Sequence, residues 1–237
     1  MFESDVFLNS TGNRLLASLP VEEYEQLQCN LEPVHLSFGE VLYESGESME
    51  YVFFPTTAYI SLLYTTIDGE TTEMASVGNE GMVGVVLFMG SDTAPNRAVV
   101  QVSGEAFRMK PKDMQQEFKR GNAFQVLLLR YTQALITQIS QTAVCNRLHT
   151  LQQRLCRWLL TVHDHARSND LQMTHEFISN TLGVRREVVT LAVHRLQDTG
   201  AIDCARGHIK ILDRQRLEAT ACECYCVVKD EYKRLLG

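Results

Sequence analysis

The sequence lacks the features that mark membrane and secreted proteins. Its longest apolar runs, such as Val83–Met89 and Val126–Leu129, are far shorter than the roughly 18–20 apolar residues of a membrane-spanning helix. No basic residue precedes Arg14, whereas a signal peptide begins with a positively charged region. We therefore expect a cytoplasmic protein with no membrane partner.

Motifs of the common enzyme classes are also missing. The sequence contains no P-loop, no dinucleotide-binding glycine motif, no Gly-x-Ser-x-Gly elbow and no His-Glu-x-x-His pair. No other set of side chains has the spacing of a catalytic site. We predict that the chain is not an enzyme and assign no catalytic residue.

Cysteine is present in an odd number, seven, and is spread along the chain, which favours a reducing compartment over a disulfide scaffold. The densest group is Cys222, Cys224 and Cys226. Alternate cysteines on one helix or strand converge poorly, and no Cys-x-x-Cys pair accompanies them, so we expect no metal site there. Oxidation of these three thiols remains an alternative. The sequence requires no cofactor.

Charge is distributed unevenly about a net value of −7. Residues 1–146 carry a net charge of −10, whereas residues 147–237 carry +3. The N-terminal part is acidic and the C-terminal part is basic, which indicates that any nucleic-acid contact lies in the C-terminal part.

The front of the chain predicts an α+β protein with an N-terminal antiparallel β-roll. Residues 13–30 have helical spacing interrupted by a proline, and residues 31–110 form short runs rich in β-branched and aromatic residues between glycines. Asp68-Gly69 predicts a hairpin with a two-residue primed turn, which requires positive φ. We assign residues 1–120 to a β-roll sensor or effector domain.

A long dimerisation helix is predicted over residues 121–146. Pro111 begins a helical region that Gly121-Asn122 divides into a short helix and a long one. The long one carries a stripe at near-heptad spacing, which we interpret as a homodimer seam although packing within one chain is the commoner use of such a stripe. The seam residues are Phe124, Leu128, Tyr131, Leu135, Ile139 and Thr142.

Residues 147–237 are assigned to a C-terminal winged helix-turn-helix domain. Within Met173–Asp213, Thr174 is suited to cap a short helix, and Gly183 allows a sharp turn. A second helix from about Arg185 to Asp198 precedes a small β-hairpin. Helix, glycine turn, helix and hairpin in this order predict binding to double-stranded DNA.

The second helix places charged side chains at the end that enters the major groove. Arginine there pairs with guanine, and glutamate accepts from cytosine. Basic residues of the hairpin would approach phosphates. The predicted DNA-binding residues are Thr174, Arg185, Arg186, Glu187, Thr190, Arg206, His208 and Lys210.

These segments resemble the CRP/FNR family of bacterial transcription regulators. The resemblance rests on LGVRREVV, RLQDTGAI and RGHIKILDRQRLE, and it extends from about Leu15 to Leu217. It implies a homodimer that binds a roughly palindromic operator and contacts RNA polymerase. It also implies that Arg186 and Glu187 read bases, whereas Leu191 stands where the family has a further arginine.

The sensor region departs from family members that bind cyclic AMP. Those members carry Gly-Glu-x-Gly and later Arg-Ser-Ala or Arg-Thr-Ala, where this sequence has Gly81-Met82-Val83-Gly84 and Asn96-Arg97-Ala98. Met82 cannot accept a ribose hydroxyl proton, so we expect no cyclic AMP binding of the usual kind. An iron–sulfur cluster is not expected either, since only Cys29 lies near the N-terminus. The candidate effector-pocket residues are Gly81, Met82, Gly84, Asn96, Arg97, Ala98 and Tyr131.

Two functions are therefore compared. The leading hypothesis is a sequence-specific DNA-binding regulator that acts as a dimer. The rival is a small-molecule or redox sensor whose winged domain binds another protein. The negative net charge of the chain and the absence of an arginine at Leu191 favour this rival. Salt dependence separates them, because phosphate contacts make affinity fall steeply with salt concentration.

Overall fold

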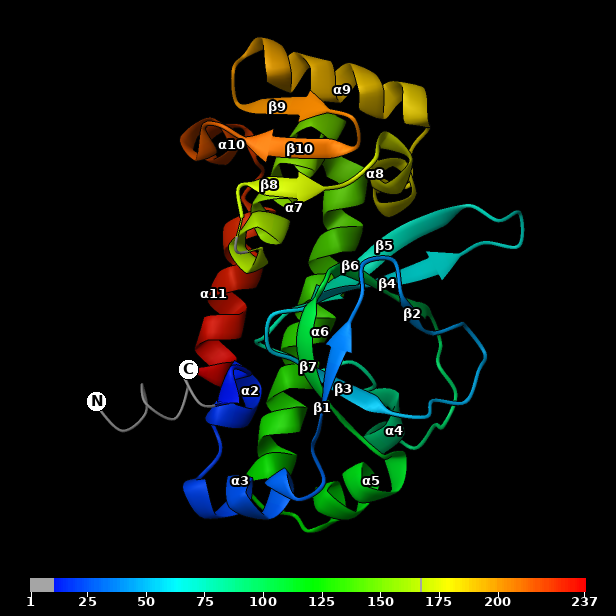
Figure 1. Ribbon diagram of the computed structural model, residues 1–237, viewed down its shortest axis with the longest axis vertical. Coiled ribbons are helices and arrows are strands. Elements are labelled where there is room, and N and C mark those ends of the chain that lie inside the picture. The colour runs from blue at the N-terminus through cyan, green and yellow to red at the C-terminus, as the bar shows by residue number, and fades with distance from the viewer. Residues whose placement is uncertain (1–10, 167) are drawn as a thin grey trace. The chain divides into compact units, whose positions relative to one another are not determined.

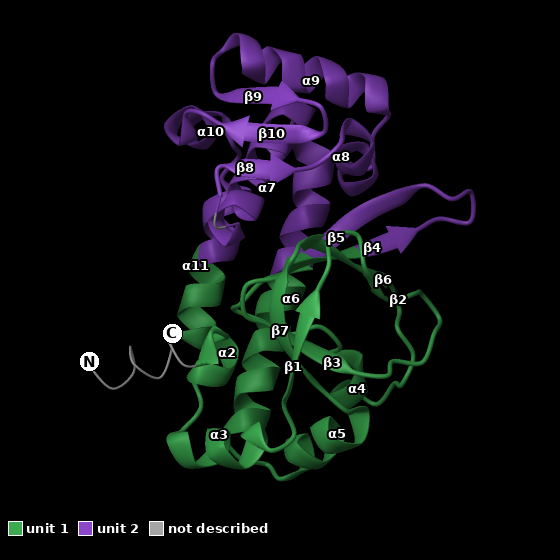
Figure 2. Ribbon diagram, viewed as in Figure 1, with its two compact units in different colours: residues 1–62, 76–137, 230–237 green, residues 63–75, 138–229 purple. Residues whose placement is uncertain are grey.

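A computed structural model describes residues 11–166 and 168–237, and its α+β architecture confirms the predicted fold class (Figure 1). The chain divides into two compact units (Figure 2). Unit 1 comprises the described part of residues 1–62 with 76–137 and 230–237, and unit 2 comprises 63–75 and 138–229. The units are therefore not contiguous in sequence, unlike the predicted domains.

The first elements of unit 1 are two short helices on either side of Pro20, as predicted. Helix α2 spans Arg14–Ala17 and is capped by Asn13, whose side chain accepts a hydrogen bond from Leu16 N at 3.0 Å. Helix α3 spans Val21–Gln28. Both helices bury leucines in the core of unit 1.

The region of short runs predicted over residues 31–110 forms strands β1 to β7. They are β1 (Glu32–Leu36), β2 (Val41–Tyr43), β3 (Val52–Pro55), β4 (Tyr59–Thr65), β5 (Thr71–Val77), β6 (Arg97–Val102) and β7 (Gly104–Met109). They pair in the orders β1-β7-β3 and β2-β6-β4-β5. Inward side chains such as Phe54, Ile60 and Val100 are completely buried, so burial of β-branched and aromatic residues stabilises the roll.

The hairpin between β4 and β5 forms, but the predicted two-residue turn is wrong. Thr66 N donates to Glu70 O at 2.8 Å, which leaves three residues in the loop. Gly69 has φ of +85°. This geometry is typical of a three-residue hairpin loop that ends in a left-handed glycine.

Three helices follow the strands or interrupt them. Helix α4 (Val86–Met89) was not predicted. Helix α5 (Pro111–Lys119) begins with its proline at the first position, as predicted, and α6 (Ala123–Leu148) is the long helix. Among the described residues, no helix has the length and apolar character needed to cross a membrane.

Most of the residues predicted to form the dimer seam of α6 are buried within their own chain, so the predicted seam is corrected. Five of its six residues are buried within their own chain, and Ile139 is half-buried, so these side chains are not free to meet a second copy. A different heptad series on the same helix is exposed. It consists of Val126, Leu129, Gln133, Ile136, Ser140 and Ala143, which follow one another at steps of three and four.

Unit 2 contains the predicted winged helix-turn-helix. Its elements are α7 (Leu151–His165), β8 (Asp170–Gln172), α8 (His175–Leu182), α9 (Arg186–Asp198), β9 (Ile202–Ala205), β10 (His208–Ile211), α10 (Arg214–Thr220) and the start of α11 (Cys224–Leu236), up to Lys229. Strand β8 was not predicted; it completes a three-stranded sheet in the order β8-β10-β9. Trp158, Leu159, Val189 and Val193 are buried in the core of this unit.

Candidate nucleic-acid interface and neighbouring sites

The turn between α8 and α9 is held by local hydrogen bonds. Thr174 Oγ1 accepts from Phe177 N at 3.1 Å and caps α8, as predicted. Gly183 ends α8 in the left-handed region, at φ of +63°. Val189 and Val193 then bury one side of α9, which leaves its opposite side outward. The fold thus presents α9 as an exposed recognition helix.

The three charged residues at the start of α9 all lie in solvent. Arg185 caps the helix through its backbone, and Arg186 and Glu187 form the first turn. Within residues 11–166 and 168–237, none of these three side chains forms a hydrogen bond or ion pair. They are therefore free to meet an external ligand, which agrees with their predicted place.

Thr190 differs from its predicted role as an outward contact. It is half-buried, its hydroxyl donates to Arg186 O at 3.0 Å, and the same oxygen lies 3.0 Å from His175 Nδ1. His175 Nε2 in turn lies 3.5 Å from Cys204 Sγ. Burial, and then the neighbouring cations, lower the pKa of His175. Thr190 thus joins α8 to α9 from within the domain.

Sequence reasoning missed other outward residues of α9. Val188 is 45% exposed, and Leu191, where the resembled family has an arginine, is 61% exposed. His194 is exposed as well. Positions 187, 191 and 194 recur at helical spacing, so the outward face could have been found by continuing from Glu187.

The wing is a tight hairpin that displays its basic residues. Arg206 and Gly207 form its two-residue turn with φ of +49° and +82°, the positive values that a type I′ turn requires. Arg206, His208 and Lys210 are all exposed. His208 Nδ1 lies 3.0 Å from Asp170 Oδ1, so an acidic side chain accompanies that histidine.

The Gly81-Met82 turn of unit 1 is filled by side chains of the protein. The Tyr131 hydroxyl donates to Met82 O at 2.8 Å, and a Cβ at Gly81 would lie 2.5 Å from the Tyr131 ring. The Met82 side chain is buried. Burial is the main cause of the raised pKa of Tyr131. Gly81 is thus needed for packing of a tyrosine, and this turn does not fit the usual cyclic-nucleotide contacts.

The other candidate pocket residues are also engaged in the roll. A Cβ at Gly84 would lie 2.8 Å from a Val52 methyl group. Asn96 and Ala98 are buried. The Arg97 guanidinium lies 3.2 Å from a Glu44 carboxylate oxygen. The structure therefore places the predicted pocket residues in unit 1, where Arg97 forms an ion pair with Glu44 of the same chain.

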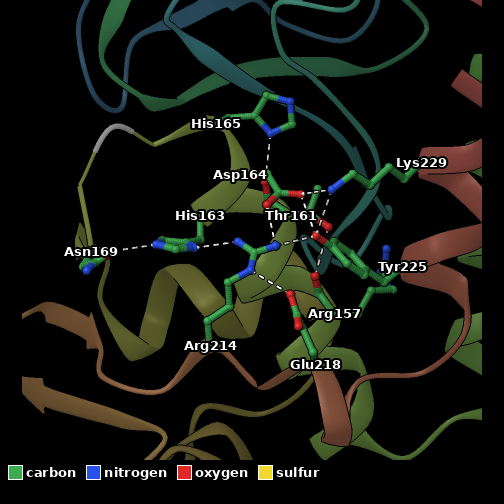
Figure 3. Close-up of polar contacts among 10 residues, drawn as sticks. All are labelled: Arg157, Thr161, His163, Asp164, His165, Asn169, Arg214, Glu218, Tyr225 and Lys229. Atoms are coloured by element: carbon green, nitrogen blue, oxygen red, sulfur yellow. Dashed lines mark hydrogen bonds and ion pairs between the residues drawn. The ribbon is translucent and has the colours of Figure 1, made fainter. Parts of the chain in front are cut away.

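A polar network holds the first half of α11 in unit 2 (Figure 3). Asp164 Oδ2 accepts from Tyr225 at 2.7 Å and from Lys229 at 3.3 Å, and Arg214 lies 2.8 Å from Asp164 Oδ1. Burial acts to raise the pKa of Asp164, but the bonds from Tyr225 and Arg214 outweigh it and hold the pKa below its usual range. The network therefore favours an ionised Asp164 and fixes Tyr225.

Cys222 and Cys224 converge, contrary to the expectation that alternate cysteines diverge. Cys222 precedes the first turn of α11, so the two residues do not share one regular helix. Both are buried beside Cys145, whereas Cys226 is exposed. Burial and the neighbouring thiols raise the pKa of Cys222 to about 12. Sequence reasoning missed Cys145 and His149, whose spacing of four residues on a helix was the available signal.

Two sequence-family profiles match the chain. The cyclic nucleotide-binding domain matches residues 33–120, and the Crp-like helix-turn-helix domain matches residues 153–220. No match was found among curated protein sequences.

Solved structures share the fold at low identity. FixK2 from Bradyrhizobium japonicum is 17% identical with a TM-score of 0.68, covering 81% of this chain and 98% of its own. The c-di-GMP responsive regulator CLP from Xanthomonas campestris is 14% identical with a TM-score of 0.63, covering 81% and 99%. A CRP-family transcriptional regulator from Thermus thermophilus is 19% identical with a TM-score of 0.66, covering 79% and 96%.

Proposed function

Because the chain belongs to the CRP/FNR family of transcription regulators, we propose that it acts as a homodimer that binds a roughly palindromic operator. Regulators of this family are not enzymes, in agreement with the sequence. One observation carries the proposal. The charged start of α9 is exposed and has no partner among the described side chains. Such a regulator acts on DNA in the cytoplasm, and RNA polymerase is the further partner that the family implies.

The outward face of α9 supports reading of specific bases. Arg186 can pair with the guanine O6 and N7 acceptors, and Glu187 can accept from cytosine N4. Leu191 offers only methyl groups, which suit the methyl group of thymine. Arg206 and Lys210 on the wing supply phosphate contacts, which position the domain without specifying sequence. We therefore expect a half-site in which a thymine replaces the base that a family arginine would read.

The exposed heptad series of α6 supports the homodimer. Leu129 is 53% exposed and Ile136 is 56% exposed, and both occupy the same heptad position. Val126 extends the apolar stripe by one step, and Ala143 is small enough for close approach. A second copy would bury these residues along a two-fold axis, which also explains a palindromic operator.

Control by an effector other than cyclic AMP is proposed for unit 1. Met82 stands in place of the glutamate that binds ribose, and Tyr131 occupies the turn. The fold itself does not fix the effector, since CLP is described as c-di-GMP responsive. Calorimetric titration of the full chain with cyclic AMP is expected to give no binding heat at millimolar nucleotide, and a saturable isotherm would contradict the proposal.

Selection of bound sequences from random duplex DNA tests the main proposal. We expect a two-fold motif and an affinity that falls steeply with salt. Arg186→Ala should lose about 1–3 kcal/mol of specific binding, which is about 5- to 150-fold. Arg130→Ala, an exposed arginine of α6, is the matched control and should bind normally. No enriched motif and a shallow salt dependence would instead favour a protein partner for the winged domain.

The dimer seam is tested separately by sedimentation. Ile136→Glu places a charge in the proposed seam and is expected to give monomers. Ile67→Glu is the control, because Ile67 is fully exposed at the tip of the β4–β5 hairpin and outside α6. An Ile136→Glu protein that remains dimeric at the same concentration would exclude this seam.

A further inference from the structure

Four side chains that commonly bind metal ions meet in unit 2. Cys145 lies on α6, His149 directly after the end of that helix, Cys222 in the segment before α11, and Cys224 at the first position of α11. Their ligand atoms all lie within 4.8 Å of one another. We propose that these residues form a Cys3His site for Zn²⁺, a further binding site of this regulator.

The spacing of the ligand atoms suits tetrahedral zinc. Cys145 Sγ and Cys222 Sγ are 3.5 Å apart, and Cys224 Sγ lies 3.5 Å from His149 Nδ1. A zinc ion with Zn–S bonds of about 2.3 Å separates two thiolate ligands by about 3.8 Å. Small side-chain rotations therefore bring all four atoms to bonding distance, and movement of the backbone is not required.

Neighbouring groups orient the ligands as they do in known metal sites. His149 presents Nδ1 to Cys224, while its Nε2 lies 3.2 Å from Glu223 Oε1. A carboxylate on the second nitrogen of a ligand histidine fixes the ring and raises its basicity. Gln141 Nε2 donates to Cys224 Sγ at 3.0 Å, a contact that stabilises a thiolate.

The charge around the cluster also favours a thiolate site. Three thiolates and one neutral histidine leave a zinc complex with a net charge of −1. Arg154 and Arg157 lie on α7, in the same unit as the cluster. The Nε atoms of both arginines are buried and have no hydrogen-bond partner in the described part of the chain. Their positive charge would be balanced by the metal complex.

The site is held in place by contacts that do not need the metal. Tyr225, next to Cys224, is bound by Asp164 and Arg214, and Lys229 one turn later is bound by Asp164 (Figure 3). This network positions the start of α11 independently of the thiols. The ligands are consequently preorganised, which lowers the entropic cost of binding.

Zinc content of the full chain, purified under reducing conditions, tests the proposal. One zinc per chain is expected to survive gel filtration. Co²⁺ in its place should give the absorption bands of a tetrahedral site with thiolate ligands. Cys145→Ser and Cys224→Ser should lose bound zinc, and Glu223→Gln should weaken binding about 10- to 100-fold. Cys226→Ser and Cys156→Ser are matched controls that should retain it, because Cys226 is exposed and Cys156 is outside the cluster.

Three results would overturn the site. They are absence of zinc from the reduced wild-type chain at micromolar free metal, equal loss of zinc in Cys226→Ser and Cys145→Ser, and a Cys145–Cys222 disulfide, formed by oxidants in the cell, that persists after purification with a thiol reductant. If Cys145→Ser fails to fold, His149→Gln keeps the test decisive. The His149 side chain is 13% exposed, so circular dichroism must first show that this variant is folded, and the folded variant should still lose zinc.

Discussion

The β-roll and the winged domain use their polar side chains in opposite ways. In the roll, two groups of the predicted effector site bind within their own chain: the Tyr131 hydroxyl donates to Met82 O, and Arg97 forms an ion pair with Glu44. In the winged domain, Arg186 and Glu187 extend into solvent without partners among the described residues. Both domains match family models, yet Asn96 and Tyr131 of the proposed effector site are buried, whereas Arg186 and Glu187 of the proposed DNA interface are exposed.

The difference teaches that a fold match and a site match are separate findings. Packing constrains the roll, because Gly81 and Gly84 must accommodate Tyr131 and Val52. The same glycines would also serve a ligand, so a glycine pattern alone does not indicate a nucleotide site. Arg186, by contrast, is exposed on α9 and its side chain forms no hydrogen bond or ion pair with the described residues, so packing does not account for it.

The largest effect on stability is expected when the Tyr131 side chain is removed from the core of the β-roll. Tyr131→Ala should lower the free energy of unfolding by about 3–5 kcal/mol, because it removes a fully buried ring and its hydrogen bond. Tyr131→Phe keeps the ring and should cost only about 0.5–1.5 kcal/mol. Urea unfolding of both variants and of the wild type measures these changes in the free energy of unfolding.

Nucleotide binding by the Tyr131 variants sharpens the comparison between the domains. If the departure from the family lay in Tyr131 alone, Tyr131→Ala would gain cyclic AMP binding. We expect no gain, because Met82 still lacks an acceptor. A saturable calorimetric isotherm for Tyr131→Ala would show that the tyrosine alone blocks the site.

Sequence patterns predicted local structure well and non-local contacts poorly. The strands and both helices of the helix-turn-helix follow from period-two and helical spacing and from glycine turns. The seam of α6 did not, because Phe124 and Val126 begin two heptad series and only tertiary packing decides which series is buried. The cysteine cluster joins residues 77 positions apart, a contact that spacing within one segment cannot reveal.

A substitution in the winged domain should change specificity while leaving stability intact. Leu191→Arg adds a guanidinium to the exposed face of α9, where it can pair with guanine. We expect the selected motif to change from thymine to guanine at one position of each half-site, with discrimination of about 1–3 kcal/mol. The unfolding midpoint should stay within the error of wild type, since Leu191 is mostly exposed.

The control for this prediction lies at the other end of the same helix. Arg195 is exposed on α9, so Arg195→Leu changes charge on that helix without adding a group near the first turns. It should leave the preferred bases unchanged. An unaltered motif for Leu191→Arg would mean that Leu191 does not face the base edges.

The smallest effect is expected at the tip of the wing, where stability and binding oppose each other. Arg206 has φ of +49°, a conformation that costs an ordinary residue roughly 1–2 kcal/mol and that asparagine adopts readily. Arg206→Asn should therefore stabilise the winged domain by about 1 kcal/mol. It should also weaken binding to all sequences alike and lower the salt slope by about 1, because one phosphate contact is lost. Lys210→Gln on unstrained strand β10 should lower the slope without the gain in stability, and an Arg206→Asn variant that binds as wild type would assign the strained turn to folding alone.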